Sequence, residues 1–308
     1  MFAGLVRKRI VAKATKYGRL PLLAVLLIVL TGLSQTIMAE KPEPIAGKEF
    51  TLRSMPFFKP KLVRGWWQPF REHIRTQTGM IVNISPSQSF GALLTDSSNE
   101  LYDLYLVPDH FIPLLINSYG AQPVIAINLK VTPTLIYRKD LGIKDIVELR
   151  NKCIAMAHEI AMLSILGKEW LVTLGLSPFV DYQALHLATY QDVAMKVLSG
   201  QCEAGVMTSS LIENMPETSR GLLTVVDIPV PDDTWGGVAI LARKDLDAEY
   251  INSFQNALLS FGKTPATAHL MANPVYGEPI IMDRKMLEYF ERQYRSVESQ
   301  LIPYLSPE

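Results

Sequence analysis

Residues 80–107, MIVNISPSQSFGALLTDSSNELYDLYLV, decide the fold class. Two apolar runs, at 80–84 and 101–107, enclose a segment from Ser89 to Leu94 with the apolar spacing of a helix. A strand, a helix and a second strand at this spacing form a crossover unit, in which the two strands are parallel. The stretch therefore predicts an α/β fold.

The same alternation continues on both sides of this stretch. Before it lie an apolar run at 49–55 and a predicted helix from Lys61 to Thr78, which Gly79 ends. After it, a helix at 110–120 leads into an extended segment, 123–139. The alternation then restarts, with strands predicted at 153–157, 184–188 and 203–207 and helices at 160–174 and 191–198. A second extended segment, 222–242, is followed by two predicted helices, 248–261 and 283–293.

The two extended segments indicate that one lobe is inserted into another. We expect lobe one to comprise 49–135 and 225–308, lobe two to comprise 136–224, and two crossover strands to form the hinge. Each lobe is expected to hold a doubly wound, mainly parallel sheet. Ligands of such sheets bind outside the carboxyl ends of the strands, which predicts a binding cleft between the lobes.

The amino-terminal segment is typical of an export signal. Residues 1–39 carry six basic side chains and no acidic one, followed by an apolar run from Leu20 to Leu33. That run is shorter than the ~20 residues that cross a bilayer comfortably, and Ala39 is suited to signal-peptidase cleavage before Glu40. We therefore expect export to the periplasm, with 40–48 as a linker. The alternative is an uncleaved anchor in the inner membrane, formed by residues 20–39.

The charge of the exported part excludes some partners. The full chain has 30 basic and 30 acidic residues, so removal of 1–39 leaves 24 basic against 30 acidic residues, a net charge of about −6. Nucleic acids and acidic membrane surfaces require a basic face, and neither is expected as a partner. We expect a monomer.

The two cysteines are predicted to form a disulfide. Cys153 opens the first strand of lobe two, and Cys202 stands just before the third. In the doubly wound order 2-1-3 these strands are neighbours, about 4.8 Å apart, which suits a disulfide. The alternative is a pair of buried free thiols.

Four segments together resemble the phosphonate/phosphate-type substrate-binding proteins of ABC transporters. They are WWQPFREHIRTQTGMIVNI (66–84), LYDLYLVPDHF (101–111), TLIYRKDLGIKDIVELRNKCIAMA (134–157) and YQDVAMKVLSGQCEAGVM (190–207). Their order and spacing carry the resemblance, which spans roughly residues 48–262. It implies the type II periplasmic binding-protein fold, a small-molecule ligand and, as partner, the membrane permease of an ABC transporter.

One departure from the family's pattern concerns the ligand. After the strand at 153–157 the family has a loop rich in Ser, Thr and Gly that holds phosphonate oxygens. This chain has His158 and Glu159 there, and the first hydroxyl comes only at Ser164. A carboxylate at this position would repel a doubly charged anion, so we expect phosphonates to bind poorly.

Candidate ligand-binding residues are polar or aromatic side chains that follow the predicted strands. They are Phe57, Ser87, Gln88, Ser89, Asp109, His110, His158, Glu159, Tyr190, Ser209 and Trp235. Five of them have an alternative structural role: a helix cap for Ser87 and Ser89, core packing for Trp235, and a solvated loop for His158 and Glu159.

Catalytic residues, metal ligands and cofactors are not expected. The motif of a helical zinc site would need a second histidine at Met162, and no G-x-S-x-G nucleophile elbow occurs. We therefore expect a solute-binding protein of an ABC-type transport system. Two alternatives remain: a membrane-tethered accessory or sensor domain with little ligand binding, working with a membrane sensor, and an enzyme on the same fold.

Overall fold

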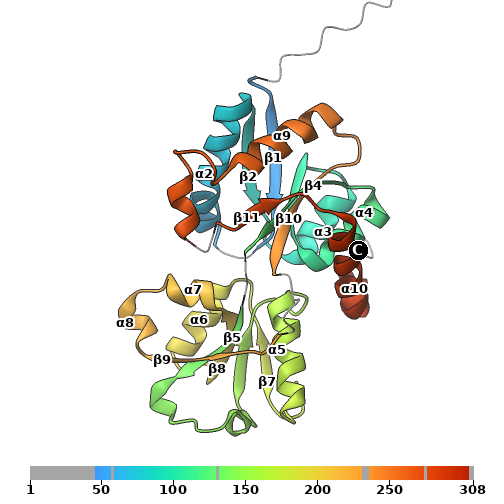
Figure 1. Cartoon of the computed structure of the whole chain (residues 1–308). Helices are drawn as coiled ribbons and strands as arrows, with labels where there is room; N and C mark the ends of the chain where they lie inside the picture. The colour runs from blue at the N-terminus through green and yellow to red at the C-terminus, as the bar shows by residue number, and fades with distance from the viewer. Residues whose placement is uncertain (1–45, 57–58, 130–131, 231–235, 274–275, 305–308) are drawn as a thin grey trace, which may run out of the picture. The chain divides into compact units, whose positions relative to one another are not determined.

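A mixed six-stranded sheet forms the centre of lobe one in the computed structural model, which describes residues 46–56, 59–129, 132–230, 236–273 and 276–304 (Figure 1). Its order is β11-β4-β10-β3-β1-β2. β1 pairs in parallel with β2 and β3, whereas β10 runs antiparallel to β3 and β4. The strands are β1 (Glu49–Ser54), β2 (Ile81–Pro86), β3 (Leu104–Pro108), β4 (Gln122–Asn128), β10 (Gly237–Ala242) and β11 (Glu278–Ile280).

Amphipathic helices cover this sheet. The first, α2 (Pro60–Thr78), begins with proline, which suits a first helical position, and ends at Gly79 with φ of 77°. Its buried Phe70 stacks on Phe261 at 4.0 Å between ring centroids. The other helices of the lobe are α3 (Phe90–Ser98), η1 (Asp109–Phe111), α4 (Ile112–Tyr119), α9 (Ala248–Ser260), η4 (Ala268–Ala272), α10 (Arg284–Leu301) and η5 (Ile302–Tyr304).

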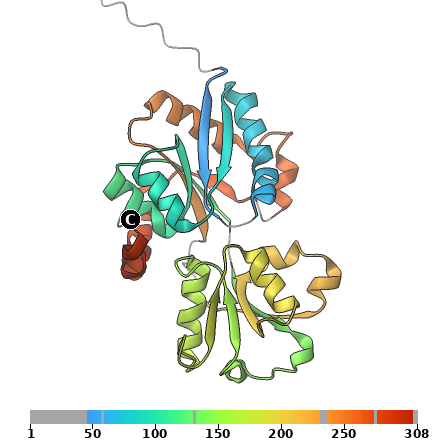
Figure 2. The same ribbon diagram turned by 180° about the vertical axis from the view of Figure 1, so that it is seen from behind.

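Lobe two contains a five-stranded mixed sheet of order β7-β6-β8-β5-β9, which Figure 2 shows from behind. Its strands are β5 (Pro133–Arg138), β6 (Cys153–Met156), β7 (Gln183–His186), β8 (Ala204–Thr208) and β9 (Leu223–Asp227). Its helices are η2 (Lys139–Leu141), η3 (Ile146–Leu149), α5 (Met162–Thr173), α6 (Tyr190–Leu198), α7 (Ser209–Glu213) and α8 (Glu217–Arg220). Gly205 lets α6 approach β8 closely, because a Cβ there would lie 2.7 Å from the Val193 side chain.

The predicted α/β class and the strand order 2-1-3 are confirmed in both sheets. The expectation of mainly parallel sheets is wrong, because the strands that carry the chain between the lobes run antiparallel to their neighbours. The lobe-two sheet extends from Pro133 to Asp227, slightly beyond the predicted 136–224. The last helix is also longer than the predicted 283–293 and ends at Leu301.

The predicted export segment, residues 1–39, lies outside the described residues. Among the residues that are described, no helix is both long and apolar enough to cross a membrane.

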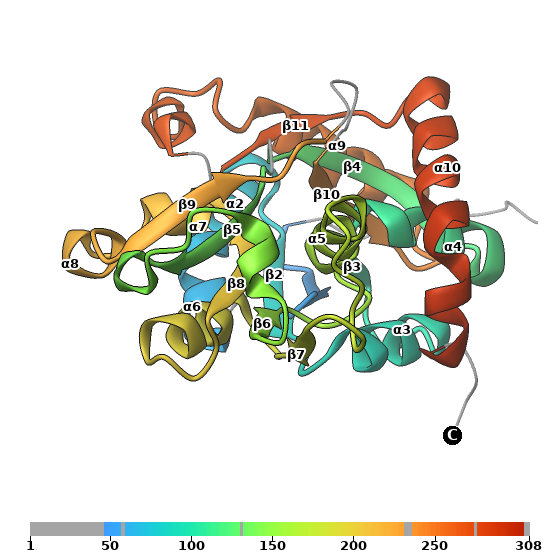
Figure 3. The same ribbon diagram turned by 90° about the horizontal axis from the view of Figure 1, so that it is seen from below.

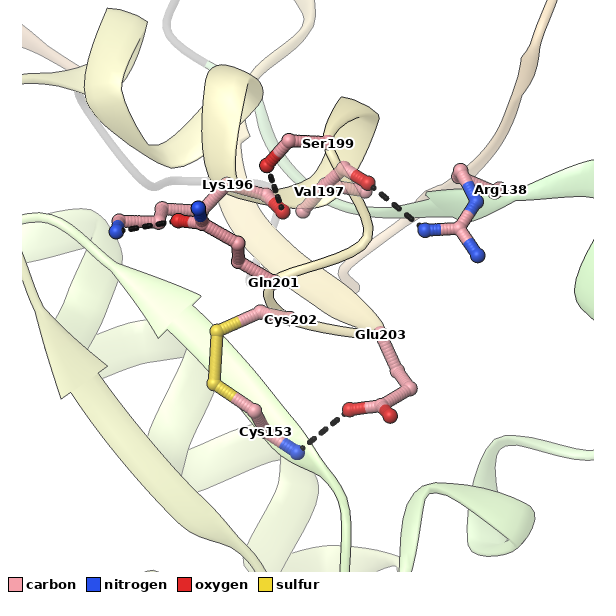
Figure 4. Close-up of a disulfide and its surroundings, with 8 residues drawn as sticks. All are labelled: Arg138, Cys153, Lys196, Val197, Ser199, Gln201, Cys202 and Glu203. Atoms are coloured by element: carbon pink, nitrogen blue, oxygen red, sulfur yellow. Dashed lines mark hydrogen bonds between the residues drawn. A yellow bond between two sulfur atoms is a disulfide. The ribbon is translucent and has the colours of Figure 1, made fainter.

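The predicted disulfide between Cys153 and Cys202 is confirmed, with a Cα separation of 4.7 Å (Figure 4). It joins Cys153, the first residue of β6, to Cys202, two residues before β8, and these two strands are parallel neighbours. The Glu203 carboxylate accepts a hydrogen bond of 2.9 Å from the Cys153 backbone N–H at the same place. The disulfide thus links β6 and β8 at their amino-terminal ends, away from the carboxyl ends of the strands.

Replacement of both cysteines with serine should lower the free energy of unfolding by about 2–4 kcal/mol, because the bond closes a long loop in the unfolded chain. Chemical denaturation of the wild type and the double variant measures the difference. Reductant should lower the stability of the wild type alone. Equal stability of the two proteins without reductant would contradict a structural role for the bond.

Candidate ligand-binding pocket

A cavity of about 300 Å³ lies where parallel strands of both sheets end. Pro56 follows β1, the segment Gln88–Phe90 follows β2, His158 follows β6, and His186 ends β7. A volume of this size is at the small end of ligand-binding pockets. The described lining residues are Pro56, Gln88, Ser89, Phe90, His158, His186, Leu187 and Ala188.

The lobe-one wall is the turn between β2 and α3. Ser89 caps α3, and its Oγ accepts a hydrogen bond of 3.0 Å from the Ala92 N–H. The buried Ser87 stabilises the turn, because its backbone N–H donates to Ser54 O and its Oγ donates to Ser89 O. Gln88, between the two serines, is exposed and offers an amide donor and acceptor to the cavity.

The lobe-two wall holds two imidazole rings with opposite hydrogen-bonding roles. Nδ1 of His186 lies 2.9 Å from Ala157 O, and a carbonyl only accepts, so Nδ1 carries a hydrogen, and in the neutral form of this ring Nε2 would be an acceptor. His158 Nδ1 accepts from the Ile160 N–H at 3.5 Å, which assigns the hydrogen of its neutral ring to Nε2. The two rings therefore add one acceptor and one donor.

His158 is neutral at pH 7. Burial lowers the pKa of this imidazole below its ordinary value of 6.5, and the nearby His186 lowers it further, whereas the Glu159 carboxylate opposes both effects. The ring packs between aromatic side chains, with its centroid 5.8 Å from Phe90 and 5.3 Å from Tyr304.

Two polar contacts connect the lobes beside the cavity. The fully buried His110 donates from Nε2 to Ile160 O at 2.8 Å, and its own N–H donates to the buried Asp109 carboxylate. On the surface, Lys59 Nζ lies 3.3 Å from an Asp192 carboxylate oxygen. The His110 contact fixes the position of the loop that carries His158.

A third contact between the lobes involves Glu159. Tyr304 Oη donates a hydrogen bond to the Glu159 carboxylate. This bond is the main cause of a lowered pKa of Glu159, with smaller contributions from the nearby His186, His158 and Lys168. Glu159 is therefore ionised at neutral pH.

The structure brings Gln88, Ser89 and His158 together in the cavity and places His110 and Glu159 in contacts between the lobes, whereas Asp109 accepts a hydrogen bond from its neighbour His110 within lobe one. The remaining predicted residues lie elsewhere or are not described. Ser87 stabilises its turn, Tyr190 is buried at the start of α6, and Ser209 donates from its N–H to Thr132 O. Phe57 and Trp235 lie outside the described residues. The ligand-binding roles of all these residues stay predictions.

Sequence reasoning did not single out His186, Phe90 or Leu187 as site residues. His186 is the only polar side chain inside the apolar run 184–188, and its position at the end of that run is the signal that could have identified it. In the part of the chain that the structure describes, no cluster of three or more His, Cys, Asp or Glu is arranged to hold a metal ion.

Comparison with models of protein families shows to which family the chain belongs. Residues 54–277 match the model of the family described as "ABC transporter, phosphonate, periplasmic substrate-binding protein". The chain belongs to this family. The match confirms the resemblance seen in the four sequence segments. A comparison with curated proteins finds no match.

Solved structures of periplasmic binding proteins share the fold of this family member. PhnD1 from Prochlorococcus marinus, solved with methylphosphonate, is 14% identical with a TM-score of 0.68, over 82% of this chain and 98% of that one. A phosphonate-transporter binding protein from Pseudomonas aeruginosa is 13% identical, with a TM-score of 0.66 over 83% and 96% of the two chains. The alkanesulfonate-binding protein SsuA from Xanthomonas axonopodis pv. citri, solved with MOPS, is 13% identical, with a TM-score of 0.57 over 85% and 96%. At these identities the likeness shows the fold alone.

Stability should fall as the pH drops below about 6.5, and His158→Gln should reduce this dependence. As the pH falls below the ordinary pKa of 6.5, His158 binds a proton in the unfolded chain at a higher pH than in the folded protein, because folding lowers its pKa. The free energy of unfolding therefore decreases until the pH reaches the folded pKa. Denaturation curves between pH 5 and 8 measure the slope. The exposed His269→Gln variant is the control, and identical slopes for wild type and His158→Gln would contradict the assignment.

Proposed function

We propose that this family member binds a small solute in the cavity between the ends of β1, β2, β6 and β7, and presents it to the membrane permease of an ABC transporter. The observation that carries the proposal is a small cavity at the carboxyl ends of parallel strands of both lobes, with polar side chains from each lobe in its lining. Binding there would favour the state in which the lobes are in contact, which a permease can distinguish from the separated state.

The lining favours a neutral, polar solute. It offers an amide from Gln88, a hydroxyl from Ser89, and two imidazoles with opposite hydrogen-bonding roles. No Lys or Arg is among the described residues that line the cavity. A doubly charged phosphonate would therefore be desolvated without a cationic partner, which is unfavourable.

The loop after β6 supports the same conclusion. Ser164, the first hydroxyl after β6, lies in the first turn of α5, is fully buried and donates to Ala157 O at 3.1 Å, so this hydroxyl is already used within the protein. The ionised Glu159 adds a negative charge to the loop. Both features disfavour the phosphonate binding that the family description suggests.

A ligand-poor accessory or sensor domain is the second candidate. It is favoured by the contact between Tyr304 and Glu159, in which the chain joins its own lobes without a solute.

A thermal-shift screen of small solutes tests the transport proposal. A solute at 100 times its dissociation constant should stabilise the protein by about 2.7 kcal/mol. Neutral polar solutes should include a stabilising compound, whereas methylphosphonate and phosphate should not stabilise. A clear upward shift with phosphate or methylphosphonate, and with no neutral or cationic solute, would contradict the proposed solute class. A screen without any stabilising solute would favour the accessory domain.

For the solute so identified, Gln88→Ala should weaken binding about two- to tenfold, because one hydrogen bond contributes roughly 0.5–1.5 kcal/mol. Gln183→Ala is the matched control, since Gln183 is also exposed but lies at the opposite end of β7. Calorimetric titration gives both dissociation constants. Equal weakening by the two substitutions would place the solute elsewhere.

The exported protein should begin at Glu40 and occur in the periplasm. Intact mass of the protein from the periplasmic fraction measures this directly. Recovery from the membrane pellet with residues 1–39 attached would instead favour the anchored sensor.

A further inference from the structure

The carboxyl-terminal segment of the chain lies beyond the region that matches the family. The match ends at residue 277, whereas α10 and η5 cover 284–304. Helix α10 packs on α4 and η1 through a buried face formed by Phe290, Val297 and Leu301. Figure 3 shows its carboxyl end beside α3, and η5 contacts α3. The segment is thus a fixed part of lobe one, positioned at the start of the helix that Ser89 caps.

Tyr304, at the end of this segment, covers the first turn of α3. A Cβ added to Gly91, the second residue of that helix, would lie 3.3 Å from Cδ1 of the Tyr304 ring. The N–H groups of a first helical turn lack partners within the helix and attract anions. The ring therefore lies against the first turn of α3, the turn that carries these N–H groups.

The same side chain reaches lobe two. Its hydroxyl donates to the Glu159 carboxylate, and its ring centroid lies 5.3 Å from that of His158. Burial, with the neighbouring Glu159 carboxylate as a second cause, raises the pKa of Tyr304 to about 12. The hydroxyl therefore keeps its proton at physiological pH and remains a donor to an ionised acceptor. The Glu159 carboxylate thus places a negative charge at the edge of the pocket.

We propose that Tyr304 is a specificity-determining residue that acts as a clasp: it holds Glu159 across the two lobes and shields the start of α3 from anionic solutes. This inference rests on the proposed binding function, and it adds two separate roles. The hydroxyl favours contact between the lobes in the solute-free protein. The ring and the Glu159 carboxylate together exclude phosphate and phosphonate groups.

The first role is tested in the absence of any solute. Tyr304→Phe removes the hydroxyl and keeps the ring, so the ratio of closed to open molecules should fall about three- to tenfold, as expected for an exposed hydrogen bond to a charged group. Small-angle X-ray scattering should show a larger radius of gyration. Tyr294→Phe is the matched control, because Tyr294 donates to Glu298 within the same helix at 3.2 Å.

The second role is tested with inorganic phosphate and methylphosphonate as probes. Tyr304→Ala with Glu159→Gln removes both the ring and the negative charge, and should raise the affinity for these anions at least tenfold by calorimetry. Tyr294→Ala with Glu298→Gln is the control and should leave it unchanged. Circular dichroism and the melting temperature establish that the variants are folded.

An unchanged radius of gyration for Tyr304→Phe, together with an unchanged anion affinity for the double variant, would overturn the clasp. The scattering result does not depend on any solute, so failure of the clasp is distinguishable from failure of the binding proposal. A larger radius with unchanged anion affinity would remove the selectivity role and keep the contact between the lobes.

Discussion

The direction of the parallel strands is the constraint on which the pocket depends. β1, β2 and β3 in one sheet, and β6, β7 and β8 in the other, run parallel within each sheet, so the loops after them lie together at one edge. Residues at or just after the ends of four of these strands line the cavity. A fifth strand, β3, leads into His110. Polar residues that are far apart in the chain thereby lie together around the cavity. The disulfide lies at the opposite end of the lobe-two sheet, so it does not obstruct the pocket.

Of the three contacts between the lobes described above, one is buried and two are exposed. His110 is fully buried and donates to a backbone carbonyl of the loop that carries His158, so loss of this bond would leave a buried polar group unsatisfied. Lys59 with Asp192 is an exposed pair, as is Tyr304 with Glu159, and such pairs stabilise only modestly. Contacts of modest strength are compatible with the proposed separation of the lobes, because a few kcal/mol would then suffice to shift the population between the two states.

Most of the fold was predictable because its signals are local. Apolar runs of strand length, helices ended by Gly79 or Gly120, and the crossover spacing each lie within a few residues of sequence. The doubly wound strand order then predicted the disulfide between Cys153 and Cys202. Strand direction was not predictable at β5 and β10, since an apolar run does not encode which way its neighbours run. The rule that ligands bind at the carboxyl ends of strands led to Gln88, Ser89 and His158, which line the cavity. It missed His186 inside an apolar run, and nothing local could indicate Tyr304, which meets Glu159 across 145 residues of sequence.

A crystal structure of the protein with a stabilising solute tests the central claim most directly. We predict that the solute lies in the cavity between the lobes and contacts Gln88, His158 and His186. A second cavity, of about 590 Å³, is lined by residues that include Glu213, His269 and Tyr276. A solute held in that second cavity, with the first left without one, would contradict the account.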